Sequence, residues 1–166
     1  MAVKKKRVYL ETSVISYLTA RPSRSAMQAA QQDATKLWWR EHRPLFDVFV
    51  SELVDEEIEQ GDANAVRRRQ ESVVMLERKP ITDEAVELTD RLLRAHALPR
   101  NAHEDAMHVA LATVHEMDIL LTWNCRHIAN VVVEPRIMAT IIEANYKPPR
   151  ITTPEKMLKA PIGEWR

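Results

Sequence analysis

Four polar residues stand beside apolar segments, where folding can bring them near the core of the protein. Glu11 and Asn124 each follow an apolar run of strand length, while Glu57 and Asp105 lie in segments with helical character. Carboxylate and amide oxygens are the ligands that hard cations such as Mg²⁺ and Mn²⁺ prefer. Three carboxylates placed together would repel one another, and a bound divalent ion would remove that cost. These residue types therefore indicate metal-assisted hydrolysis of a phosphate ester.

The same acids also have structural interpretations that the pattern leaves open. Asp105 can stabilise a helix N-terminus through the helix dipole. Glu57 belongs to the acidic run 55–59 and can lie on a solvated helix face. Function therefore depends on whether the surrounding elements bring these side chains together.

Those elements alternate between strand-like and helix-like segments. Strands are expected at 7–10, 45–50 and 119–123, with a short extended piece at 80–81 and a strand or turn near Ile151. Helices are expected after an N-cap at Thr12-Ser13 and over 26–40, 51–60, 63–76, from Thr82, and over 104–116 and 137–144. This alternation predicts an α/β fold with a mainly parallel central sheet. In such sheets, functional sites form beyond the carboxyl ends of the strands, where Glu11 and Asn124 stand.

Length and composition limit the alternatives. The chain has 166 residues, of which 45% are hydrophobic, which suits one domain. We place that domain at 1–146 and treat 147–166 as a proline-containing tail, packed on the domain or on a second chain.

Several classes of function are excluded or disfavoured by residue counts. Lys plus Arg and Asp plus Glu each number 24, so bulk positive charge cannot drive nucleic-acid binding. Two glycines, Gly61 and Gly163, are too few for glycine-rich phosphate loops. A single cysteine, Cys125, excludes a disulfide within the chain. No apolar stretch is long enough to cross a membrane, so we expect a cytoplasmic protein with no membrane contact.

Four short segments resemble the motifs of the PIN-domain family, in the order in which that family has them. They are VYLETSVI (8–15), VSELVDEEI (50–58), DAMHVALA (105–112) and DILLTWN (118–124), which together cover the chain from residue 7 to about 130. The third and fourth are the more specific in combination. The chain resembles in particular the VapC-like toxin ribonucleases of that family.

The resemblance implies a three-layer α/β/α sandwich that hydrolyses RNA with Mg²⁺ or Mn²⁺. It also implies the toxin of a toxin–antitoxin pair, with a homodimeric state and a small antitoxin protein as partner. By the resemblance, Glu11, Glu57 and Asp105 are catalytic metal ligands and Asn124 is a fourth, neutral or water-mediated metal contact. Thr12 and Ser13 are then expected to bond metal-bound waters. Arg126 and His127 directly follow the Asn124 region, so they can lie at the rim of the site and contact a substrate phosphate, or form a helix-start pair that serves packing and solubility.

Two departures from the family pattern motivate a second hypothesis. The first acid of the family is usually Asp, whereas Glu11 is one methylene longer, and Asn124 carries no charge. The alternative is a catalytically weak or inactive PIN-like module that binds RNA or another protein. A nuclease that acts on DNA also stays open.

Some other residues have both a functional and a structural interpretation. His108 is expected to be structural, although it lies near Asp105. The run Arg67-Arg68-Arg69 can meet phosphates or form a solvated helix face, and Trp38, Trp39 and Trp123 can stack on bases or pack in a core or dimer interface.

Overall fold

The computed structural model describes residues 4–166 and contains a five-stranded, wholly parallel sheet. The strand order is β3-β2-β1-β4-β5. The strands are β1 (Arg7–Leu10), β2 (Asp47–Ser51), β3 (Glu77–Lys79), β4 (Ile119–Leu121) and β5 (Arg150–Thr152).

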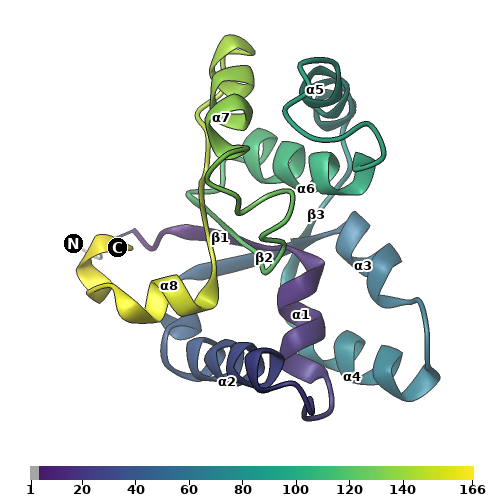
Figure 1. The fold of residues 1–166 in the computed structure, drawn as a ribbon, viewed down its shortest axis with the longest axis vertical. Helices are drawn as coiled ribbons and strands as arrows, with labels where there is room; N and C mark the ends of the chain where they lie inside the picture. The colour runs from purple at the N-terminus through teal and green to yellow at the C-terminus, as the bar shows by residue number, and fades with distance from the viewer. Residues whose placement is uncertain (1–3) are drawn as a thin grey trace.

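Helices cover both faces of the sheet, as Figure 1 shows. On one face lie α5 (Asp83–Arg94), α6 (His103–Val114) and α7 (Glu134–Glu143). On the other lie α1 (Thr12–Thr19), α2 (Ala26–Glu41), α4 (Ala63–Val73) and α8 (Pro154–Lys159). The helix α3 (Glu52–Ile58) follows β2 directly, and short 3₁₀ turns occupy Arg43–Leu45 and Ile162–Glu164. The predicted three-layer α/β/α sandwich is confirmed.

The central strands β1 and β4 are buried along most of their length because helices cover them on both sides. Val8, Tyr9 and Leu10 of β1 are fully buried, as are Leu120 and Leu121 of β4. A strand that is buried on both faces has no solvent side and needs no alternation of polar and apolar residues. The unbroken apolar runs in the sequence are explained by this position.

The strand order places a topological switch point between β1 and β4. The chain runs outward from β1 to β2 and β3, and then returns to the other side of β1 as β4. Ligands of open α/β sheets bind beyond the carboxyl ends of strands at such a point. Here Glu11 directly follows β1 and Thr122 directly follows β4.

Two elements were missed or misplaced in the sequence-based prediction. Instead of the extended piece expected at 80–81, the structure has the strand β3 at Glu77–Lys79. Its residues are all charged, which suits an edge strand but gives no apolar pattern from which a strand could be predicted. The helix α8 was not predicted, although Pro154 at its start and the Thr153 side chain, which accepts from Lys156 N, form an ordinary helix start.

The start of α1 also differs from the prediction. The N-cap is Glu11, not Thr12-Ser13, and no side chain caps the helix. Thr12 and Ser13 instead lie in the first helical turn, where their hydroxyls are free to bond other groups.

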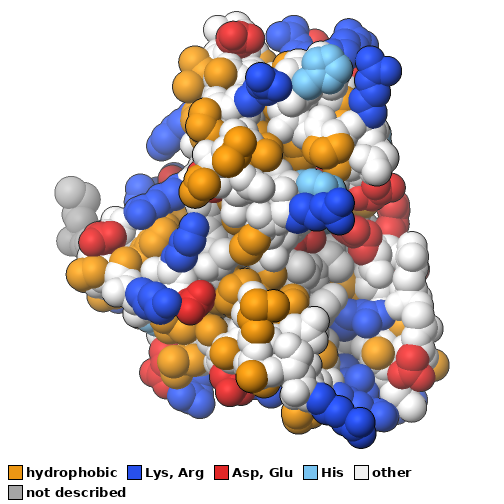
Figure 2. All heavy atoms as spheres, in the orientation of Figure 1, with side chains coloured by type: hydrophobic (Ala, Val, Ile, Leu, Met, Phe, Trp, Pro, Cys, Tyr) orange, Lys and Arg blue, Asp and Glu red, His pale blue; other side chains and the backbone are white. Residues whose placement is uncertain are grey.

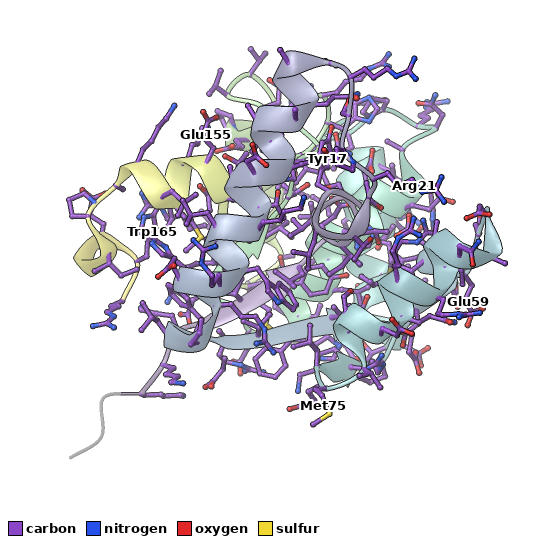
Figure 3. All side chains as sticks on the ribbon, turned by 90° about the horizontal axis from the view of Figure 1, so that it is seen from below. Tyr17, Arg21, Glu59, Met75, Glu155 and Trp165 are labelled. Atoms are coloured by element: carbon purple, nitrogen blue, oxygen red, sulfur yellow. The ribbon has the colours of Figure 1, made fainter. Side chains whose placement is uncertain are left out.

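Residues 147–166 contribute to the same sheet and to the helical layer on one of its faces. β5 pairs with β4, and α8 lies beside α2 in Figures 1 and 3. Trp165 lies under the Arg150 guanidinium, at 3.7 Å from ring centroid to Cζ. The domain boundary at residue 146 stays a prediction. Within residues 4–166, no helix has the length and apolar character needed to cross a membrane.

Candidate active site

Glu11 is buried and joins the ends of the two central strands. Its side chain accepts a hydrogen bond from Thr122 Oγ1 at 2.8 Å, and the Ser13 hydroxyl donates to the same carboxylate oxygen. Ser13 Oγ in turn accepts from the backbone N–H of Trp123 at 2.8 Å. Only 6% of Glu11 is exposed, so these partners replace water in stabilising its charge.

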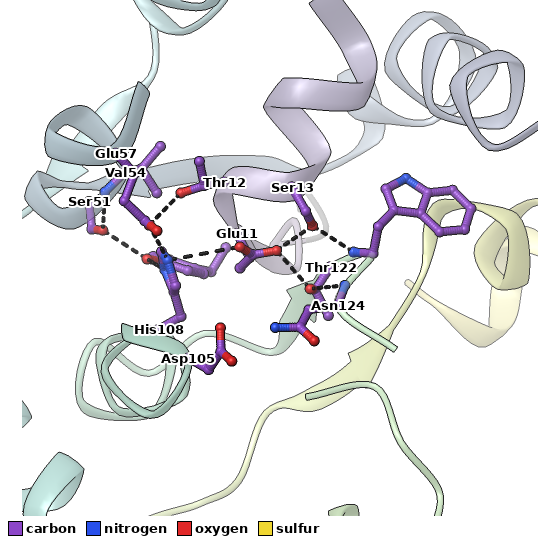
Figure 4. Close-up of polar contacts among 12 residues, drawn as sticks. Glu11, Thr12, Ser13, Ser51, Val54, Glu57, Asp105, His108, Thr122 and Asn124 are labelled. Carbon is purple, nitrogen blue, oxygen red and sulfur yellow. Dashed lines mark hydrogen bonds and ion pairs between the residues drawn. The ribbon is translucent and has the colours of Figure 1, made fainter. Parts of the chain in front are cut away.

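Glu57 lies in the last turn of α3 and faces the same region (Figure 4). Its Oε1 accepts from Thr12 Oγ1 at 2.7 Å and from His108 Nε2 at 2.5 Å. Burial raises the pKa of Glu57, but the hydrogen bond and charge of His108 and the hydrogen bond from Thr12 outweigh it, so the pKa is lowered overall. Glu57 is therefore held as a carboxylate.

His108 lies between the two glutamates and is almost completely buried. Its Nε2 is 3.9 Å from Glu11 Oε1, and its Nδ1 lies 2.7 Å from the Tyr9 hydroxyl. Burial lowers the pKa of His108, yet the hydrogen bond to Glu57 and the nearby negative charges raise it above its ordinary value overall. The imidazole thus lies among carboxylates that favour its charged form.

Asp105 and Asn124 form a second group at the same edge of the sheet. Asp105, in the first turn of α6, bonds through Oδ2 to His127 Nδ1 at 2.7 Å. Asn124 Oδ1 accepts from the backbone N–H of His127 at 3.0 Å. The loop after β4 is thereby tied to α6, and it also carries the exposed Arg126.

The sequence-predicted residues therefore lie around one edge, but in two hydrogen-bonded groups. Glu11 and Glu57 meet at His108, and Thr12 and Ser13 bond these carboxylates directly. On the face drawn in Figure 2, acidic side chains gather near a histidine and a basic side chain at the junction of the two helical layers.

A divalent metal fits this site by the chemistry of its donors. The hydrogen bonds from neighbouring side chains fall on one oxygen of each carboxylate: Oε2 of Glu11, Oε1 of Glu57 and Oδ2 of Asp105. As the side chains now lie, no group of three or more His, Cys, Asp or Glu residues within 4–166 has metal-holding geometry. Metal binding by all three carboxylates therefore requires Asp105, which is bonded to His127, to approach Glu11 and Glu57, which meet at His108.

Four side chains of the site were not predicted as functional. They are Tyr9, Ser51, His108 and Thr122. His108 carried the clearest signal, because it lies one helical turn after Asp105 and so shares its face of the helix.

Two other groups of residues have structural roles, although for two of the arginines the role differs from the solvated helix face that was weighed. Arg68 donates to Thr19 O, and Arg69 donates to Ile58 O and Gln60 O, so both bond carbonyls at helix ends. Trp38 and Trp123 are buried in the core and are not available to stack on bases.

Two solved structures resemble this fold. The Mycobacterium tuberculosis VapC20 structure, of a sarcin-ricin loop cleaving toxin, matches with a TM-score of 0.53 and 16% identity, covering 68% of this chain and 86% of that chain. Rickettsia felis VapBC2, bound to a DNA fragment from its promoter, matches with a TM-score of 0.51 and 11% identity, covering 89% of this chain and 98% of that chain. No curated protein matches the sequence.

The sequence also matches a family model, the PIN domain, over residues 8–130. This range includes all four motif segments and every residue of the candidate site described above. The protein belongs to the PIN-domain family.

Proposed function

We propose that this protein is a metal-dependent endoribonuclease and the toxin of a toxin–antitoxin pair. The observation that carries the proposal is the convergence of Glu11, Glu57, Asp105 and Asn124 at the carboxyl edge of a PIN-domain sheet. The buried Glu11 and the partly buried Glu57 and Asp105 are held by donors at a topological switch point, which is costly to fold, and a functional site explains that cost.

In this proposal Glu11, Glu57 and Asp105 hold Mg²⁺ or Mn²⁺, and Asn124 supplies a neutral oxygen. The bound ion would polarise the phosphodiester and lower the pKa of an attacking water. Thr12 and Ser13 keep the two glutamates in place through the hydrogen bonds already described. Arg126 is exposed on the loop beside Asp105 and can pair with a substrate phosphate.

The named relatives support the choice of partners. VapC20 is described as cleaving the sarcin-ricin loop, which supports RNA as the substrate class. VapBC2 is described as bound to a DNA fragment from its promoter. A small antitoxin protein as partner is proposed from the family resemblance. We place the protein in the cytoplasm, where its RNA substrate lies.

A homodimer is also part of the proposal. Val131, Val132 and Ile142 are 77%, 83% and 59% exposed, and they lie on α7 and the loop before it. Apolar side chains gather over this region in Figure 2, and such patches mark contact surfaces between proteins. Light scattering after size-exclusion chromatography tests this state directly.

The central test is Mn²⁺ titration calorimetry together with RNA cleavage, for wild type and Asp105→Asn. The substitution keeps the size of the side chain and removes its charge, so Mn²⁺ binding and cleavage are both expected to fall. Asp90→Asn is the matched control, because Asp90 is exposed on α5. Full nuclease activity of Asp105→Asn in a clean preparation would refute the proposal.

One observation favours a second function. Within residues 4–166, no group of three or more His, Cys, Asp or Glu side chains is arranged to hold a metal ion. The protein would then be a catalytically weak or inactive module that binds RNA or protein. This alternative predicts no Mn²⁺ binding at millimolar metal. A parallel assay on single-stranded DNA separates the ribonuclease from a DNA-acting nuclease.

A further inference from the structure

A chain of buried hydrogen bonds runs through the core and ends at Glu57. Ser51 Oγ lies 2.8 Å from the Tyr9 hydroxyl, which lies 2.7 Å from His108 Nδ1. His108 Nε2 then lies 2.5 Å from Glu57 Oε1. Figure 4 labels Ser51, His108 and Glu57, which lie close together at the candidate site.

Both ends of this chain lie on the same helix. Ser51 is the N-cap of α3, and its Oγ accepts from Val54 N at 3.3 Å. Glu57 lies in the last turn of that helix. These hydrogen bonds therefore hold both the start of α3 and the Glu57 carboxylate near its end. They do so through Tyr9 of β1 and His108 of α6.

The hydrogen-bond directions are determined by the carboxylate. An ionised Glu57 can only accept, so His108 Nε2 donates to it. In a neutral imidazole, Nδ1 then accepts from the Tyr9 hydroxyl, whereas in a charged imidazole Nδ1 donates to it. In both forms His108 presents its Nε2 donor to Glu57, and the Tyr9 hydroxyl orients the ring through Nδ1.

His108 cannot itself reach a substrate or a solvent-side ligand. Its side chain is 1% exposed, whereas that of Glu57 is 30% exposed. The imidazole therefore acts through Glu57, whose other oxygen remains available to the site. Residues that orient metal ligands in this way commonly change metal affinity about 10- to 100-fold when mutated.

We propose that His108, oriented by Tyr9, is a positioning residue that fixes Glu57 for metal binding. This inference rests on the proposed function, and it assigns to His108 a role in place of the purely structural one expected from the sequence. Thr12 bonds the same oxygen of Glu57 from the other side and shares this role.

Two amide substitutions separate positioning from simple packing. In His108→Gln, the amide nitrogen can reach the place of Nε2 and donate to Glu57. In His108→Asn, the shorter amide can meet the Tyr9 hydroxyl near the place of Nδ1 but cannot reach Glu57. Positioning predicts that Asn weakens Mn²⁺ binding about tenfold, while Gln stays within about threefold of wild type.

The measurement is the Mn²⁺ dissociation constant by titration calorimetry, without substrate. Circular dichroism melting of each variant shows that it is folded. The matched control is His115→Asn, the same change at the end of the same helix, where Nε2 bonds only the carbonyl of Pro80. Tyr9→Phe should weaken binding in the wild-type background and have no further effect in His108→Asn, because both act through one hydrogen bond to Glu57.

The outcomes are distinct. Equal Mn²⁺ affinity in wild type and folded His108→Asn, or equal losses in the Asn and Gln variants, would overturn the positioning role while leaving the nuclease proposal intact. Tighter binding in His108→Asn would overturn it too, since the imidazole would then compete with the metal for Glu57. A wild type that binds no Mn²⁺ refutes the proposed function itself, together with this inference.

Discussion

Replacing Thr122 by valine tests whether buried hydrogen bonds stabilise Glu11 in its place. The change keeps the shape of the side chain and removes one hydroxyl. In the structure that hydroxyl donates to Glu11 at 2.8 Å and accepts from the backbone N–H of Asn124 at 2.9 Å. Both bonds involve groups that are buried or partly buried, so water cannot fully replace them.

The expected cost follows from these two bonds. A hydrogen bond to a charged group contributes roughly 1.5–3 kcal/mol, and an unpaired buried donor costs about 1–3 kcal/mol. Partial relaxation of the loop after β4 reduces the sum, so we expect the free energy of unfolding of Thr122→Val to fall by about 3 kcal/mol. Urea denaturation measures this change directly, with the slope checked against wild type.

The matched control is Thr113→Val, another buried threonine. Its hydroxyl donates to the carbonyl of Val109 at 2.8 Å within α6, and that carbonyl belongs to the helix ladder already. We expect this control to cost less than about 1 kcal/mol. If Thr122→Val were no more destabilising than Thr113→Val, the argument that Thr122 holds the buried charge of Glu11 would be refuted.

Three further predictions concern pH, reactivity and backbone conformation. The pKa of His108 is raised, so its contribution to stability is present below the ordinary histidine pKa and is lost as the pH rises through the raised pKa. The pKa of Glu57 is lowered, so its contribution is present above the ordinary glutamate pKa and is lost as the pH falls through the lowered pKa. Urea midpoints measured across pH should therefore fall on both sides, and a profile that is flat through the alkaline arm would contradict the first part. Cys125 is exposed, but partial desolvation raises the pKa of its thiol, with Lys156 opposing. The native protein should therefore react with iodoacetamide at pH 7.5 more slowly than a free thiol does, and urea should restore the ordinary rate. Gly61 has φ +99°, so Gly61→Ala should lower the free energy of unfolding by about 1 kcal/mol. In the control Gly163→Ala the added methyl group meets no atom within 4 Å, so stability should change little. Equal unfolding midpoints for the two variants would contradict this explanation of Gly61.

The elements that the sequence predicted well are those whose pattern is local. Unbroken apolar runs identified β1 and β4 because a central parallel strand is buried on both faces. The edge strand β3 has the sequence ERK and carries no such pattern, so only its pairing with β2 defines it. Sequence periodicity thus located the centre of the sheet better than its edge.

The candidate site was likewise predictable from the sequence only where its features are local. The carboxylates were found because they follow strands or lie in motif segments, which are local features. Their partners were not, because the hydrogen bonds join residues that are far apart in the chain: His108 to Glu57 spans 51 positions, Tyr9 to His108 spans 99, and Thr122 to Glu11 spans 111. Such contacts arise only from the order of the strands in the sheet.

Tyr9 shows where a sharper reading of the sequence was possible. A tyrosine in the central strand of a parallel sheet is buried, and its hydroxyl must then find partners inside the protein. The polar side chains able to supply them lie near the carboxyl ends of the strands or on the helix packed against them, which limits the choice to residues such as Ser51 and His108. The buried hydroxyl thus links the central strand β1 to the carboxylates at the end of the sheet. It makes the position of Glu57 depend on Tyr9, which the family motif includes only as part of a strand.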